Sequence, residues 1–86
     1  MVVKVFSKKE CPKCGAAKEF ASLTSAQGMV VEMHDIETVD GLSEAAMYSI
    51  MATPSVVVTD EYGRAMQKWK GAIPAMEELL VVTKNA

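Results

Sequence analysis

Short β-rich runs alternate with amphipathic segments along the whole chain. Two of these runs, Val2–Phe6 and Met29–His34, predict strands. Between them, apolar residues recur at helical spacing after Pro12 and end before Gly28, which predicts a helix. The apolar positions of that helix are Ala16, Ala17, Phe20, Ala21 and Leu23. We therefore expect the chain to begin with a parallel β-α-β unit.

A second helix and a buried strand are predicted in the middle of the chain. Asp40 is expected to be the N-cap of the helix, because its side chain can accept a hydrogen bond from the first turn. The inner face of this helix is expected to carry Leu42, Ala46 and Ile50. The run Ser55–Thr59 contains three consecutive valines, which indicates a strand that is buried on both faces.

The last part of the chain predicts a hairpin and a third helix. Asp60–Gly63 is a turn that leads into a partner strand at Arg64–Lys70. Pro74 is expected to open a helix whose apolar residues are Met76, Leu79, Leu80 and Val82. The order β-α-β-α-β-β-α predicts an α/β fold, a four-stranded mixed sheet flanked by three helices.

Length and charge narrow the class of protein. A chain of 86 residues predicts a single domain, residues 1–86, and half of its residues are hydrophobic. The net charge is −2 and the lysines and arginines are dispersed, which does not favour a nucleic-acid surface. The apolar runs are too short to span a bilayer, and the N-terminus lacks a signal-peptide pattern. We expect a cytoplasmic monomer that binds neither nucleic acid nor membrane.

The two cysteines of the chain, Cys11 and Cys14, lie between a predicted strand and the helix that follows it. A disulfide scaffold would need more cysteines, and a tetrahedral zinc site would need two further ligands. His34 is the one other candidate ligand, and we expect it at the surface or bonded to a loop. Redox chemistry without a bound cofactor is the favoured interpretation. A metal- or iron–sulfur-binding module that pools Cys11 and Cys14 from two chains is the alternative.

The position of the cysteines at a helix start supports the redox interpretation. Residues three apart across the first turn are neighbours, and their Cα separation fits the range of about 4.4–6.8 Å that a disulfide requires. The helix dipole and the charges of Lys13 and Lys8 favour a thiolate at Cys11. We expect Cys11 to attack a substrate disulfide and Cys14 to resolve the mixed disulfide, with Pro12 stiffening the loop.

Three stretches of sequence match a known family. The first is Lys8-Lys9-Glu10-Cys11-Pro12-Lys13-Cys14, in which a lysine stands three residues before the first cysteine. The second is Tyr48-Ser49-Ile50-Met51-Ala52-Thr53-Pro54-Ser55-Val56-Val57-Val58, and the third is Trp69-Lys70-Gly71-Ala72-Ile73-Pro74. Together they resemble the thioredoxin superfamily, and most closely its small glutaredoxin and NrdH-redoxin branch.

This resemblance implies a thioredoxin-like fold and the activity of a protein-disulfide reductase or electron carrier. It implies that the Thr53–Pro54 peptide bond is cis and faces the cysteines, and that the backbone of Thr53 pairs with the substrate. Met51, Gly71 and Trp69 are expected beside the bound substrate.

Departures from the family patterns bear on the electron donor and on the proton relay. The resemblance implies reduction by a thioredoxin-reductase-like flavoenzyme or by glutathione. Ala72 stands where glutaredoxins have a second glycine and Lys13 where they favour tyrosine, which weakens the case for glutathione. Val5 and Phe6 stand where larger thioredoxins carry a buried aspartate. The sequence therefore lacks a proton-relay carboxylate at that position.

Overall fold

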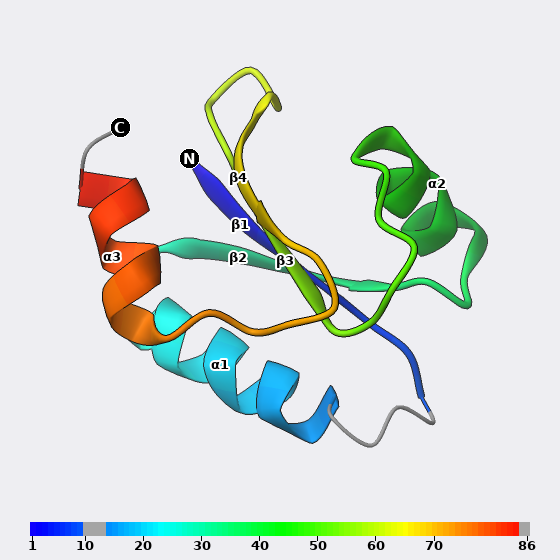
Figure 1. The fold of residues 1–86 in the computed structure, drawn as a ribbon, viewed down its shortest axis with the longest axis horizontal. Coiled ribbons are helices and arrows are strands. Elements are labelled where there is room, and N and C mark those ends of the chain that lie inside the picture. The colour runs from blue at the N-terminus through cyan, green and yellow to red at the C-terminus, as the bar shows by residue number, and fades with distance from the viewer. Residues whose placement is uncertain (10–13, 85–86) are drawn as a thin grey trace.

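A computed structural model describes residues 1–9 and 14–84 (Figure 1). Its elements follow the expected order β-α-β-α-β-β-α. They are β1 (Val2–Ser7), α1 (Cys14–Ala26), β2 (Val30–Asp35), α2 (Val39–Met47), β3 (Ser55–Thr59), β4 (Ala65–Trp69) and α3 (Met76–Lys84). Within the described ranges, no helix combines the length and the apolar character that a membrane span requires.

The four strands form one mixed sheet in the order β2-β1-β3-β4. β1 is parallel to β2 and antiparallel to β3, and β3 is antiparallel to β4. β1 and β3 therefore lie in the centre. All five residues of β3 are buried, which confirms the interpretation of its consecutive valines.

The sheet separates two apolar clusters, as Figure 1 shows by the helices on its two sides. Alternate side chains of a strand point to opposite faces. On one face, Val3 and Val5 pack with Val56 and Val58 and with residues of α1 and α3 such as Leu79. On the other face, a smaller cluster lies under α2; its members are Phe6, Ala45, Tyr48, Ile50 and Val57.

The start and the inner face of α2 differ from the prediction. Thr38, and not Asp40, is the N-cap, because its Oγ1 accepts a hydrogen bond from the Gly41 backbone N–H at 3.0 Å. The buried residues of the helix are Gly41 and Ala45, whereas Leu42 is 59% exposed. Ala46 is exposed as well. The helix packs through small residues because its first turn approaches the backbone of Asp35 at the end of β2.

The third helix also begins later than predicted. Pro74 is buried ahead of α3, which starts at Met76. The Ala75 backbone N–H donates to Glu78 Oε1 at 3.3 Å, and this side-chain cap sets the start of the helix. Leu79 is fully buried, whereas Leu80 faces solvent.

Candidate active site

Cys14 is the first residue of α1 and is only 5% exposed. In the sequence, one loop separates Cys14 from the end of β1. Cys14 therefore lies at the end of the sheet where α1 begins. This end of a helix carries the positive end of the helix dipole, which favours negative charge nearby. Cys11, Pro12 and Lys13, the other predicted members of the motif, lie outside the described residues.

A cavity of about 210 Å³ lies beside Cys14. Its lining residues are Ser7, Lys8, Lys9, Cys14, Gly15, Lys18 and Asp35. The three lysines are exposed at its rim, while Asp35 is half-buried. Lys8, predicted as a supporting residue, thus lines the same cavity as the buried cysteine. The cavity combines a thiol, a carboxylate and three ammonium groups in one place.

The loop after β1 is anchored to the loop after β2. The Lys9 backbone N–H donates to Glu37 Oε1 at 2.9 Å, and the Ile36 backbone N–H donates to the Ser7 carbonyl at 3.0 Å. These two bonds hold the walls of the cavity together beside the first turn of α1.

The peptide bond between Thr53 and Pro54 is cis. Pro54 is buried and Thr53 is half-buried, immediately before β3. In Figure 1, the segment that leads into β3 and the segment that follows β4 come together in the lower part of the view, and the start of α1 lies below them.

Ser55 joins two of the segments that were predicted to bind substrate. Its Oγ donates to the Ala52 carbonyl at 2.6 Å and accepts from the Gly71 backbone N–H at 2.9 Å. Gly71 has a φ of +72°, a conformation that glycine adopts without steric cost. Ser55 therefore fixes the loop after β4 against the segment that contains Thr53 and Pro54.

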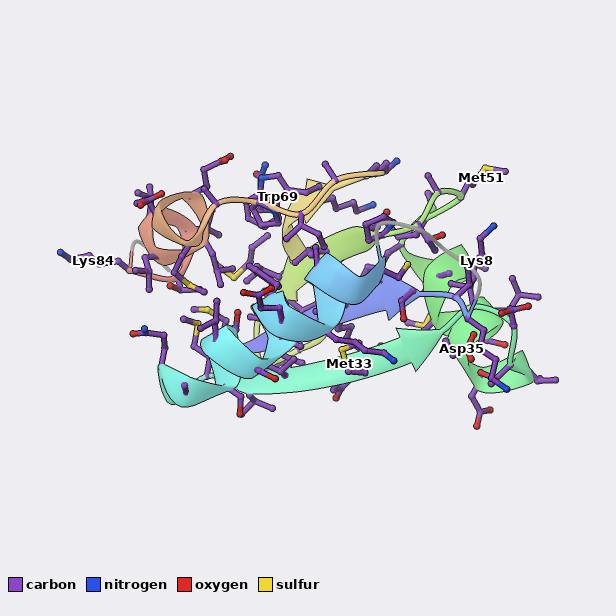
Figure 2. The ribbon with its side chains drawn as sticks, turned by 90° about the horizontal axis from the view of Figure 1, so that it is seen from below. Lys8, Met33, Asp35, Met51, Trp69 and Lys84 are labelled. Atoms are coloured by element: carbon purple, nitrogen blue, oxygen red, sulfur yellow. The ribbon has the colours of Figure 1, made fainter. Side chains whose placement is uncertain are left out.

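Met51 and Trp69 have different surroundings. The Met51 side chain is 94% exposed, and in Figure 2 it projects at the same end of the molecule as Lys8 and Asp35. Trp69 is half-buried, packs against the core cluster on the α1 face and lies towards the middle of the molecule. Met51 is thus available to a partner, whereas much of Trp69 is engaged in packing.

A charged network on the α2 face of the sheet was not anticipated from the sequence. The Lys4 ammonium contacts the carboxylates of Glu44 and Glu32, the latter at 3.3 Å, and lies 5.4 Å from the centre of the Tyr48 ring. Glu32 also bonds to His34 at 3.0 Å, and the His34 ring stacks on Phe6. His34 is therefore held within this network. Glu32 and His34 are two residues apart on β2, but Lys4 comes from β1 and Glu44 from α2, so no sequence spacing signals the whole network.

The network changes the protonation of two of its members. Burial alone would lower the pKa of Lys4, but hydrogen bonds to Glu44 and Glu32 and the charge of Glu32 more than offset this and raise it above its ordinary value. The hydrogen bond from His34 holds the pKa of Glu32 below its ordinary value, against the effect of burial and with a further contribution from Lys4.

Glu32, His34 and Glu44 place one potential ligand atom each within 4.8 Å of the others. The Lys4 ammonium lies between the two carboxylates and supplies the positive charge that a cation would bring. This group is therefore an ion-pair network built around a lysine.

Solved structures of thioredoxins share this architecture. Thioredoxin 1 from Thermosipho africanus superposes with a TM-score of 0.76 over 99% of this chain and 92% of its own, at 15% identity. The thioredoxin of Fasciola hepatica gives a TM-score of 0.75 over 99% of this chain and 80% of its own, at 21% identity. The chain has the thioredoxin-like fold.

The amino-acid sequence points to the same class. Residues 1–84 match the family model described as a thioredoxin domain. A protein of Archaeoglobus fulgidus described as "Probable Thioredoxin" is 29% identical over 63 residues, which make up 72% of this chain and 69% of the relative. The chain belongs to the thioredoxin-domain family, a scaffold for thiol–disulfide oxidoreduction.

Proposed function

We propose that this protein is a dithiol–disulfide oxidoreductase that reduces disulfides in other proteins through Cys11 and Cys14. One observation carries the proposal: Cys14 is buried at the first turn of α1, in a cavity lined by lysines. Cys11 precedes it by three residues, the spacing of a redox-active pair in a β-α-β setting.

The reaction transfers two electrons in two exchange steps. The Cys11 thiolate attacks one sulfur of the substrate disulfide, and the other substrate sulfur leaves as a thiolate. Cys14 then attacks the Cys11 sulfur, which releases the second substrate thiolate and leaves a Cys11–Cys14 disulfide. Pro12 and Lys13 set the stiffness and charge of the loop, and Lys8 adds positive charge beside the cavity.

Thr53, Pro54, Met51 and Gly71 form the proposed substrate-binding edge. Ser55 ties the segments of Thr53 and Gly71 together, and Met51 offers an exposed apolar side chain beside them. Trp69 is half-buried and packs against the core cluster, and we include the exposed part of its side chain in this edge.

A thioredoxin-reductase-like flavoenzyme is the proposed electron donor, in a cytoplasm that keeps thiols reduced. Ala72 and Lys13 depart from the glutaredoxin pattern and so weigh against glutathione. Turnover with NADPH and a thioredoxin reductase should exceed turnover with glutathione and its reductase, and the reverse ranking would assign the donor to glutathione.

Reduction of insulin disulfides tests the activity. Cys11→Ser should abolish turnover, whereas Cys14→Ser should accumulate a mixed disulfide with substrate that is visible by mass spectrometry. The matched control is the double variant Cys11→Ser, Ser22→Cys, which carries a thiol at an exposed position of α1 instead. This thiol should not restore turnover. Unchanged turnover in Cys11→Ser, or purification as a coloured dimer or with stoichiometric zinc, would contradict the proposal.

A further inference from the structure

β2 forms one edge of the sheet. In the strand order β2-β1-β3-β4, no strand within residues 1–9 and 14–84 pairs with its outer side. Figure 2 shows β2 along one border of the ribbon, with Met33 labelled beside it. Met33 is 45% exposed and Val30 is 59% exposed, so apolar side chains accompany this edge. Such an edge can accept a strand from another chain.

The two edges of the sheet differ in the features that prevent such pairing. Bulges and lysine side chains protect the edge strands of soluble proteins. At the other edge, the pairing of β3 with β4 is irregular between Val58 and Thr59, and β4 carries Lys68. β2 pairs with β1 in a regular register along all 6 of its residues, and its sequence VVEMHD contains neither lysine nor proline. β2 is therefore the edge that is suited to pairing.

The backbone groups that point away from β1 belong to alternate residues of β2. The Ile36 N–H donates to the Ser7 carbonyl, so the backbone groups of Ile36 face β1. Because these groups alternate along a strand, those of Val31, Met33 and Asp35 point outward. An added strand can form hydrogen bonds only in a register that sets these outward-pointing residues opposite its own.

Charge selects one register for a second copy of this chain in antiparallel orientation. With a two-fold axis at Met33, Glu32 of each copy lies opposite His34 of the other. An axis at Glu32 would set two carboxylates directly opposite each other, which destabilises a strand pair. An axis at His34 would set two imidazoles opposite each other and Met33 opposite Asp35. Carboxylate and imidazole are compatible neighbours, since Glu32 and His34 already bond at 3.0 Å within one chain.

We propose that two copies of this protein associate reversibly through antiparallel pairing of their β2 strands about Met33. Each Met33 N–H donates to the Met33 carbonyl of the other copy, and each Asp35 N–H donates to the Val31 carbonyl of the other copy. The Met33 side chains meet on the face of the sheet that α1 covers. The Asp35 carbonyl is already bonded to Thr38, so the ladder is short and the chain is a monomer when dilute. This association goes beyond the proposed function.

Sedimentation velocity from micromolar to millimolar concentration measures the association. The wild type should shift from a colourless monomer of 9.3 kDa towards a colourless dimer of twice that mass. Met33→Lys sets two ammonium groups opposite each other and should raise the dissociation constant of the dimer at least about tenfold. Because Met33 is 45% exposed, the new side chain can reach solvent, and circular dichroism verifies that the variant is folded.

Met47→Lys is the matched control. It makes the same change at a 70% exposed position near the end of α2. The carbonyl of the next residue, Tyr48, accepts a hydrogen bond from Lys68 Nζ on β4 at 2.7 Å. This end of α2 therefore lies towards the opposite edge of the sheet, and Met47→Lys should dimerise like the wild type.

Cross-linking with diamide tests the register. Cys11→Ser and Cys14→Ser remove the native thiols, and Met33→Cys adds one at the proposed axis. Residues of a hydrogen-bonded antiparallel pair have Cα atoms about 5.5 Å apart, within the range of about 4.4–6.8 Å that a disulfide requires. Two copies should therefore become linked through residue 33. Glu32→Cys in the same background should link more slowly, because residue 32 does not lie opposite itself.

Three results would overturn the proposal: a wild type that stays monomeric at millimolar concentration, an unchanged dimer in Met33→Lys, or faster cross-linking of Glu32→Cys than of Met33→Cys. An equal loss of the dimer in Met47→Lys would also overturn it, by assigning the association to another surface. None of these results bears on the proposed function, because Met33 is not among the residues proposed to exchange thiols or to contact substrate.

Discussion

Gly41 packs directly against the backbone of Asp35. A Cβ built on Gly41 would lie 1.8 Å from the Asp35 carbonyl oxygen and 2.5 Å from its carbonyl carbon. No side chain tolerates such an approach, so only glycine allows the first turn of α2 to close onto the end of β2. The contact links the position of α2 to the end of β2, where Asp35 lines the same cavity as Cys14.

Gly41→Ala is therefore expected to destabilise the protein. The added methyl group must push α2 away from the Asp35 backbone, at a cost of about 1–3 kcal/mol or more in the free energy of unfolding. Urea unfolding monitored by circular dichroism measures this change. Gly15→Ala in α1 is the matched control, because a Cβ there meets nothing within 4 Å and alanine favours the helix by about 0.5–1 kcal/mol. Equal stability of the two variants would contradict this account.

Ser55→Ala should loosen the proposed substrate-binding edge. The change removes the acceptor of the Gly71 N–H and the donor to the Ala52 carbonyl, and it should cost about 1–3 kcal/mol of stability. Hydrogen exchange at the Gly71 amide should accelerate. Thr83→Ala, which removes a single hydrogen bond on α3 at the surface, should change stability by less than about 0.5 kcal/mol. An unchanged Gly71 exchange rate would show that Ser55 does not hold this loop.

Met51→Gln should weaken reduction of protein disulfides and spare small ones. The side chain is 94% exposed and would become covered by a bound polypeptide, so kcat/KM for insulin should fall about threefold to tenfold, equivalent to about 0.7–1.4 kcal/mol. The rate with 5,5′-dithiobis(2-nitrobenzoate) should not change. Met47→Gln, at a 70% exposed position on α2, is the control and should alter neither. Equal loss for both substrates in Met51→Gln would refute a role in protein binding.

Acid should weaken the charged network on the α2 face. The pKa of Glu32 is lower in the folded protein than its ordinary value of 4.5, because of the His34 hydrogen bond and the Lys4 contacts. The stabilisation is therefore complete above about pH 4.5 and is lost as the pH falls through the lower folded-state pKa. Because the Glu32 side chain is 44% exposed, the contribution should amount to only about 0.2–1 kcal/mol.

Chemical unfolding of Glu32→Gln at a series of pH values measures this contribution. The variant should be less stable than the wild type at pH 6, and the difference should shrink towards pH 3. The exposed residue Glu61 provides a control, since Glu61→Gln should show no such convergence. A difference that stays constant between pH 6 and pH 3 would contradict the assigned role of the carboxylate.

Local patterns were sufficient for the order of the elements and for the candidate motif. Strand alternation and helical spacing act between near neighbours, so they locate β3 from its valines and place Cys14 at the start of α1. The same patterns failed for the inner face of α2. Which side of a short helix faces the sheet depends on how closely the two backbones approach, and at Gly41 that distance is a tertiary property.

The sequence by itself determined that this chain builds a β-α-β unit with two cysteines three residues apart, followed by a helix, a hairpin and a last helix. Only the tertiary structure decided which distant groups meet: Asp35 with Cys14 at one cavity, Ser55 with Gly71, and Lys4 with Glu44. The reason is physical. Residues close in the chain are constrained by backbone geometry, whereas these pairs are brought together by strand register and by helix packing across the sheet.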